Sequence, residues 1–186
     1  MTVIVVYDAC VLYPAPMRDT LLRIVIAGYV EARWTDKILD ECFGAILKQR
    51  PHLSPDALAR TRHLMNAVIP DCLVTDYHNS ADSIELPDPN DRHVVAAAIK
   101  CRAKAIVTMN LRDFPSAALL PFNVKAIHPD QFLREAIENE PELVTKIIRA
   151  QAADLQRPPV STSELLRILE SCGLSTSMNR LRELLG

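Results

Sequence analysis

The chain has 186 residues, 49% hydrophobic and 24% charged, which suits one folded domain of ordinary size with an appendage. No apolar run approaches the roughly 18 residues that a membrane helix needs, which excludes a membrane protein built on such helices. The formal net charge of −2 excludes a positive field over the whole molecule as a means of attracting nucleic acid. Binding of nucleic acid would therefore need bound cations or local arginines.

The sequence favours the cytoplasm. The N-terminal apolar run has no basic leader and no small-residue cleavage site. The five cysteines lie 29 to 71 residues apart and include no Cys-x-x-Cys pair, so we expect free, buried thiols in a reducing compartment.

Short apolar strands alternate with amphipathic helices in the first part of the chain. The expected strands are 3–7, 104–109 and 124–127. The expected helices are 17–29, 35–49 with Thr35 as N-cap, 54–68 with Ser54 as N-cap, a helix opened by Asp88-Pro89-Asn90-Asp91 that runs to about 101, and one capped by Asp130 that runs to about 137. This alternation predicts a parallel sheet with helices on both faces.

After Asn139 only helical periodicity of leucine and isoleucine remains. Pro158-Pro159 interrupts it, and Ser161 with Glu164 predicts a capping box for the next helix. We therefore divide the chain into an α/β domain, residues 1–137, and a helical C-terminal extension, residues 138–186.

Acidic residues follow two of the expected strands, where ligands gather in open parallel sheets. Asp8 comes directly after the first strand, and Asp113 lies four residues beyond the strand that ends at Met109. Each could instead be ordinary cap or turn chemistry. Glu41 lies beside the buried face of its helix, where an inward carboxylate is costly unless a cation or donor meets it. A paired or edge-exposed glutamate is the alternative.

Asp88 and Asp91 have a structural interpretation as well. Asp88 fits an N-cap before Pro89, and Asp91 then occupies the first turn, where the helix dipole favours a carboxylate. Asp91 also begins the apolar stripe that continues through Val94 and Ala98, so it is expected to point at the sheet.

Several acids converging without a basic partner would repel one another and raise their own pKa values unless a multivalent cation neutralised them. Oxygen ligands select Mg²⁺ or Mn²⁺ over zinc. His93 is expected on a different face of the helix from Asp91. We interpret it as structural or exposed, together with His52, His63, His78 and His128.

Four segments, in this order and spacing, resemble the PIN-domain nucleases, especially the VapC-like toxins of bacterial toxin–antitoxin pairs. They are VIVVYDACVLYP, WTDKILDE, LPDPNDRHVVAAAI and AIVTMNLRDFP. The resemblance covers about residues 3–134, and the C-terminal helices are similar to the extension of one VapC-like branch. It implies a three-layer α/β/α fold and cleavage of RNA with Mg²⁺ or Mn²⁺ as cofactor.

Position by position, the resemblance implies that the acids of the metal site are Asp8, Glu41, Asp91 and Asp113. Asp88 is a further candidate metal ligand. Asn110 matches the polar residue that often precedes the last acid, and Thr108 matches the threonine or serine of that strand end, so both become candidate substrate-binding residues. The family's usual Asp-x-Asn start is Asp8-Ala9-Cys10 here, and a cysteine cannot supply the amide hydrogen bonds of asparagine.

The resemblance also implies an antitoxin partner, and we expect a homodimer or antitoxin complex through an apolar helix face, with Leu21, Leu22, Val25 and Ile26 as one candidate.

Three arginines flank the motifs and are candidate phosphate contacts or plain solvated surface: Arg18, Arg92 and Arg112. Two other functions stay open: a phosphohydrolase with an aspartyl nucleophile at Asp8, and a PIN-like scaffold that binds RNA or a partner without cutting.

Overall fold

The computed structural model describes residues 2–77 and 84–186. Its parallel sheet has the strand order β2-β1-β3-β4. The strands are β1 (Val3–Tyr7), β2 (Val30–Arg33), β3 (Ala105–Val107) and β4 (Lys125–Ile127). Because the strands are all parallel, their carboxyl ends form one edge of the sheet, where Asp8 and Thr108 follow β1 and β3 directly.

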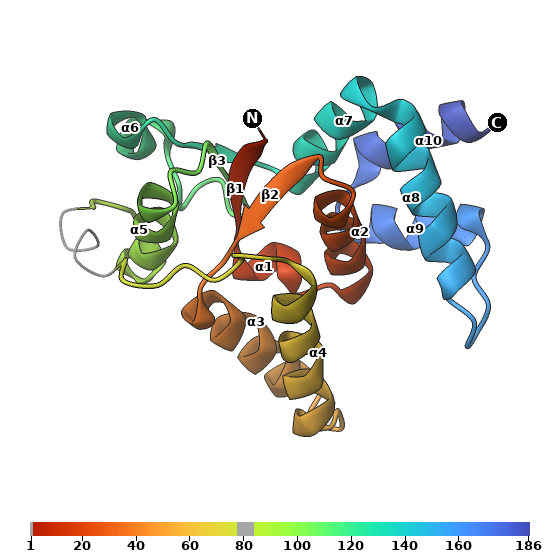
Figure 1. Cartoon of the computed structure of the whole chain (residues 1–186), viewed down its shortest axis with the longest axis horizontal. Helices are drawn as coiled ribbons and strands as arrows, with labels where there is room; N and C mark the ends of the chain where they lie inside the picture. The colour runs from red at the N-terminus through yellow and green to blue at the C-terminus, as the bar shows by residue number, and fades with distance from the viewer. Residues whose placement is uncertain (1, 78–83) are drawn as a thin grey trace.

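Helices cover both faces of the sheet, as Figure 1 shows. On one side lie α5 (Arg92–Lys100), preceded by the short helix η2 (Pro89–Asp91), and α6 (Ser116–Leu119), followed by η3 (Leu120–Phe122). On the other lie α1 (Ala9–Leu12), α2 (Ala15–Ile26) and α7 (Pro129–Asn139). The predicted three-layer α/β/α arrangement is thereby confirmed.

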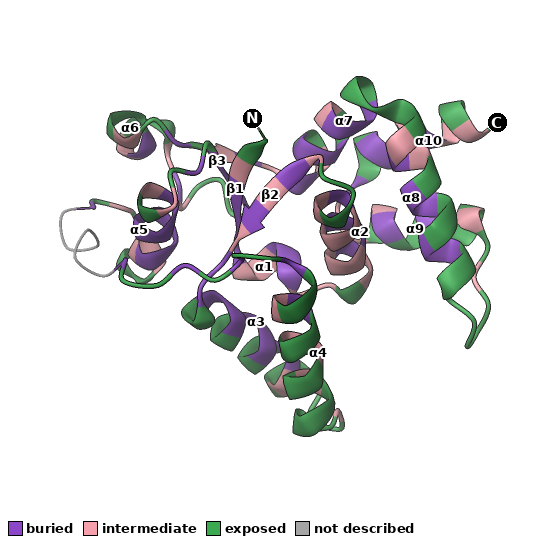
Figure 2. Cartoon of the chain, in the orientation of Figure 1, coloured by how far each residue is buried: buried purple, intermediate pink, exposed green. Residues whose placement is uncertain are grey.

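The sheet centre forms the hydrophobic core, seen as the purple interior of Figure 2. Val6, Tyr7, Ile106 and Val107 on the two central strands are each 0% exposed. Full burial of such a side chain stabilises a fold by about 1.5–3 kcal/mol. The central strands are therefore the most firmly held part of the molecule, and they end at the edge that carries the acids.

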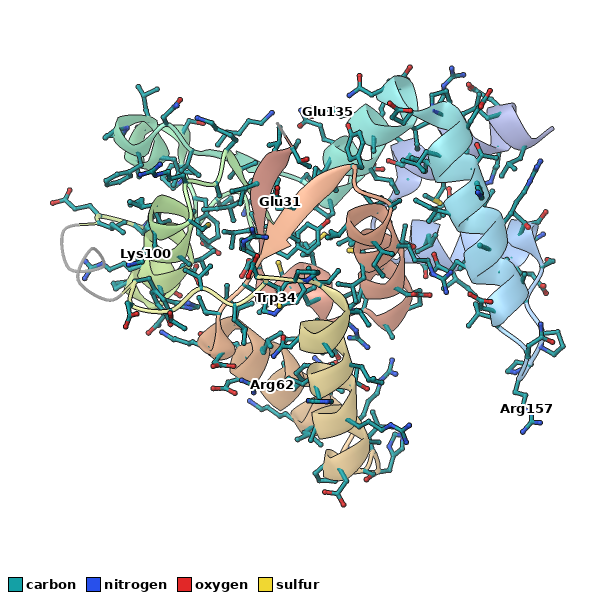
Figure 3. The ribbon with its side chains drawn as sticks, in the orientation of Figure 1. Glu31, Trp34, Arg62, Lys100, Glu135 and Arg157 are labelled. Atoms are coloured by element: carbon teal, nitrogen blue, oxygen red, sulfur yellow. The ribbon has the colours of Figure 1, made fainter. Side chains whose placement is uncertain are left out.

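The helices α3 (Asp36–Gln49) and α4 (Pro55–Val68) form a hairpin beside this edge (Figure 1). Thr35 and Ser54 cap them as predicted. Trp34, at the end of β2, is fully buried and donates its indole N–H to Asn66 of α4. Arg62 of α4 pairs with Asp36 and Asp40 of α3 (Figure 3). These contacts fix α3, and with it Glu41, relative to the sheet.

The C-terminal extension contains α8 (Pro141–Asp154), α9 (Thr162–Ser171) and α10 (Ser175–Leu185), and the predicted capping box of Ser161 and Glu164 is present. It packs on α2 and α7. Gln151 of α8 is 1% exposed; it accepts a hydrogen bond from Thr20 and donates one to the Pro16 carbonyl of α2. Buried polar groups need such partners, so this pair fixes how α8 sits on α2.

The structure corrects several predicted elements. β2 and α1 were not predicted, and β3 is shorter than 104–109. The helix expected over 17–29 ends at Ile26, because Gly28 adopts a φ of +81° and turns the chain into β2. α7 is capped by His128, whose Nδ1 accepts from the Asp130 N–H, and not by Asp130. None of the described helices is long and apolar enough to cross a membrane.

Candidate active site

Asp8 stands at the carboxyl end of the central strand β1 and is 7% exposed. One carboxylate oxygen accepts from the Ala9 N–H at 2.7 Å, so Asp8 does cap α1, as the structural interpretation required. Its other oxygen accepts the Thr108 hydroxyl at 2.7 Å. A buried carboxylate needs such donors, and these two hold Asp8 in one orientation.

Thr108 is 0% exposed, and its hydroxyl also accepts the Asn110 N–H at 3.0 Å. The hydroxyl therefore links the end of β3 to Asp8. A buried group with these partners favours a role in holding Asp8 over the contact with substrate that we expected.

Cys10 occupies the position where the resemblance leads one to expect asparagine. Its Sγ lies 3.1 Å from Asp8 Oδ2 as a donor and accepts the Met109 N–H at 3.2 Å. Burial and then the Asp8 charge raise the pKa of this thiol to about 12, so it remains a protonated donor at neutral pH. The thiol thus donates one hydrogen bond and accepts another, as an asparagine side chain does through its NH₂ group and its oxygen.

The charges of three other acids act on Asp91. Burial, followed by the charges of Asp8, Asp88 and Asp113, raises its pKa to about 6. Asp91 stands at the N-cap position of α5 but makes no capping hydrogen bond. Asp88 does cap, since its side chain accepts the Asn90 N–H at 2.8 Å. Capping therefore accounts for Asp88. Asp91 lies in the first turn of η2, where the helix dipole favours a carboxylate, so the dipole role stays open as the alternative for this residue.

Glu41 does not face inward as expected. Its side chain is 39% exposed on α3, where Lys37 approaches to 4.0 Å. Glu41 Oε1 also lies 3.0 Å from Nε2 of His93, a contact close enough for an ion pair yet not aligned as a hydrogen bond. The structure therefore brings Glu41 to His93, which follows Asp91 by two residues in the chain.

His93 was interpreted as structural or exposed, and it is 5% exposed. Neither ring nitrogen has an aligned hydrogen-bond partner. The feature of the sequence that could have indicated its burial is its position beside the buried stripe of α5, two residues after Asp91. His78 lies outside the described residues.

The remaining candidates occupy the loop after β3. Asn110 and Arg112 are exposed, and Asp113 is half-buried in the turn that its N–H closes onto the Asn110 carbonyl at 3.0 Å. Arg18, by contrast, donates to the Leu12 carbonyl at 2.6 Å and lies over the Phe43 ring. Asn110 and Arg112 are therefore free to meet a ligand, whereas Arg18 has a structural role.

Within residues 2–77 and 84–186, no three His, Cys, Asp or Glu side chains are grouped closely enough to hold a metal ion as they stand. The chemistry of the donors nevertheless fits a hard divalent cation, because Asp8, Asp88, Asp91 and Asp113 offer carboxylate oxygens. Burial and then the charges of Asp8, Asp88 and Asp113 raise the pKa of Asp91, and these acids repel one another unless a counter-charge is present. A cation held by Asp8 and Asp91 would supply it.

The chain matches two family models: a PIN domain over residues 4–112 and a VapC50 C-terminal domain over residues 129–183. The "Putative ribonuclease VapC50" of Mycobacterium tuberculosis is 42% identical over 79 residues, which is 42% of this chain and 47% of that protein. The match thus spans about half the length of this curated relative. No solved structure gives a significant match. Because the PIN-domain model matches more than half of its length, the chain belongs to the PIN-domain family.

Proposed function

We propose that this protein is a metal-dependent endoribonuclease that hydrolyses phosphodiester bonds in RNA. The observation that carries the proposal is the placement of Asp8 at the carboxyl end of β1 and of half-buried Asp91 at the start of α5, where burial and then the charges of Asp8, Asp88 and Asp113 raise the Asp91 pKa. Strongly perturbed carboxylates at the carboxyl edge of a parallel sheet are typical of functional sites. The name of the mycobacterial relative supports RNA as the substrate.

In this proposal Asp8 and Asp91 hold Mg²⁺ or Mn²⁺, with Asp113, Glu41 and Asp88 completing the site directly or through water. When bound, the cation supplies charge neutralisation and an activated water. The chain's own contribution is to orient Asp8 through Thr108 and Cys10, and to leave Asn110 and Arg112 exposed beside it for the RNA backbone.

We further propose a toxin of a toxin–antitoxin pair that acts in the cytoplasm. The match of residues 129–183 to the VapC50 C-terminal domain supports it. For an antitoxin or a second copy, the candidate α2 face needs revision, because Leu21 is 1% exposed and belongs to the core. Ile26 is 62% exposed and Leu22 lines an open apolar groove with Val68 and Leu143.

We place the domain division near residue 137, in the last turn of α7.

A catalytically impaired scaffold is the second candidate. Two observations favour it: Cys10 replaces the family's asparagine, and no metal group is assembled among the described residues. The protein should be incubated with single-stranded RNA and, separately, with a phosphomonoester, each with and without Mn²⁺. We expect RNA hydrolysis only with Mn²⁺. Binding of RNA without hydrolysis would favour the scaffold, and phosphomonoester hydrolysis would favour an aspartyl phosphohydrolase.

His93 offers a more local prediction. Removing its ring in His93→Ala frees Glu41 to swing towards solvent, so Mn²⁺ affinity is expected to fall about tenfold or more, as for other residues behind metal ligands. His93→Gln keeps a hydrogen-bond donor near Glu41, so its Mn²⁺ affinity should lie between those of the wild type and His93→Ala. Calorimetric titration of Mn²⁺ on the three proteins measures this. Equal affinities would show that the contact with His93 does not hold Glu41 for metal binding.

A further inference from the structure

The turn between α9 and α10, residues 172–174, lies at the sheet edge that carries the acids. It is held there by Asp130 in the first turn of α7, just after the carboxyl end of β4. The Asp130 carboxylate accepts the Thr176 N–H at 2.9 Å and the Ser177 N–H at 2.8 Å. These first-turn groups of α10 have no partners in their own helix, so Asp130 caps α10 from a distance.

This turn contacts the end of β3 through Gly173. A Cβ added at Gly173 would lie 2.9 Å from the Met109 Cε, so the bare face of this glycine accommodates the Met109 methyl group. The φ of +94° at Gly173 also favours glycine. Met109 directly follows Thr108. The extension therefore contacts the residue next to the hydroxyl that binds Asp8.

Met109 is in turn bonded to the site. Its backbone N–H donates to Cys10 Sγ at 3.2 Å, and that thiol donates to Asp8 Oδ2 at 3.1 Å. A continuous set of contacts thus runs from Gly173 through Met109 and Cys10 to Asp8. Displacement of Met109 would leave Cys10 without its donor and Asp8 less firmly held.

A second contact supports this placement. The turn directly follows α9, and α9 packs on α2. Met17 is fully buried near the start of α2, shortly after α1, which contains Cys10. The extension therefore contacts two parts of the chain near Cys10: Met109 after β3 through Gly173, and α2 through α9.

We propose that Met109 is a positioning residue through which the α9–α10 turn holds Asp8 in its working orientation. The extension then contributes to the orientation of Asp8 through Met109. The consequence for turnover rests on the proposed ribonuclease function, whereas the positioning itself can be measured without any activity.

The test weakens the anchor of the turn without touching the site. Asp130→Ala removes the distant cap of α10, and Asp154→Ala is its matched control, since Asp154 also ties the extension to the domain, through Arg23 of α2 at 2.8 Å. Amide hydrogen exchange at Met109 and Asn110 is expected to accelerate about tenfold or more in Asp130→Ala and to stay unchanged in Asp154→Ala.

With Mn²⁺ and RNA, kcat is expected to fall about tenfold in Asp130→Ala with little change in KM, because Asp8 and not the RNA contacts is displaced. Met109→Ala should reproduce both effects, and Met109→Leu should restore much of the wild-type behaviour. Faster exchange throughout α10 with unchanged exchange at Met109 would overturn the proposal. Absence of RNA hydrolysis in the wild-type protein would instead count against the proposed function, and the exchange comparison would still decide the role of Met109.

Discussion

Asp91→Asn is expected to abolish metal-dependent RNA hydrolysis while stabilising the metal-free protein. The substitution removes one charge and almost no volume. Turnover should fall by about a hundredfold or more, because a ligand of the proposed cation is lost. Stability should rise at neutral pH, because the asparagine carries no charge. Burial of the Asp91 charge, and then its repulsion by Asp8, Asp88 and Asp113, raise the Asp91 pKa, and both effects are relieved.

The sign of the pH dependence follows from the same pKa. In the folded protein Asp91 keeps its proton up to a pH of about 6, against 3.8 for the free side chain. The folded state therefore binds more protons than the unfolded chain between these values, and the metal-free protein loses stability as the pH rises through them. Asp91→Asn lacks this loss, so its advantage in melting temperature should be present above pH 6 and vanish below about pH 4.

Thermal unfolding in chelator at a series of pH values, with RNA turnover in Mn²⁺, measures both effects. Asp56→Asn is the matched control, since Asp56 is an acid in the first turn of α4, away from the site. It is expected to lose about 0.3–1 kcal/mol of stability through the helix dipole and to keep full activity. A fully active Asp91→Asn that also lost stability would reduce Asp91 to the same dipole role.

Cys10→Ala is expected to lower turnover about ten- to a hundredfold. The alanine removes the donor to Asp8 Oδ2 and leaves the Met109 N–H without its acceptor. Cys10→Ser, which keeps a donor and an acceptor at nearly the same place, should retain most of the activity. Cys10→Asn, the family's usual residue, should be at least as active as the wild type.

Turnover of the four proteins with RNA and Mn²⁺ compares these substitutions. Burial and then the Asp8 charge raise the pKa of the Cys10 thiol to about 12. The turnover rate of the wild-type protein should therefore show no step near pH 9 from ionisation of this thiol. An alanine variant as active as the wild type would contradict the positioning role. A large gain in Cys10→Asn alone would indicate that cysteine limits the natural enzyme.

The sequence predicts the layers and the edge of the sheet well, because buried parallel strands and capped helices have strong local signals. Thr35, Ser54 and the Ser161–Glu164 box confirm this. β2 was missed because it is a four-residue strand in which buried and partly exposed residues alternate, which gives no continuous apolar run. The His128 cap was missed because histidine is not among the usual capping residues.

The site was predictable only in part. The position of Asp8 after β1 and the crowding around Asp91 follow from strand ends and helix periodicity. The orientation of Glu41 does not follow from such local patterns. The helix pattern places Glu41 at the boundary of the buried face, and its neighbour His93 comes from α5, which packs there only in the folded protein. The bond between Cys10 and the Met109 N–H joins residues 99 positions apart, and no local pattern encodes it.

The position of β1 in the sheet has a consequence for protein synthesis. β1 is synthesised about a hundred residues before β3, the strand with which one of its edges pairs. In that pairing Val5, Val6 and Tyr7 lie opposite Ala105, Ile106 and Val107. Thr108, whose hydroxyl binds Asp8, and Asp113, the last acid of the group, are synthesised about a hundred residues after Asp8. The complete acid group can therefore form only after Asp113 has been synthesised, roughly three fifths of the way along the chain.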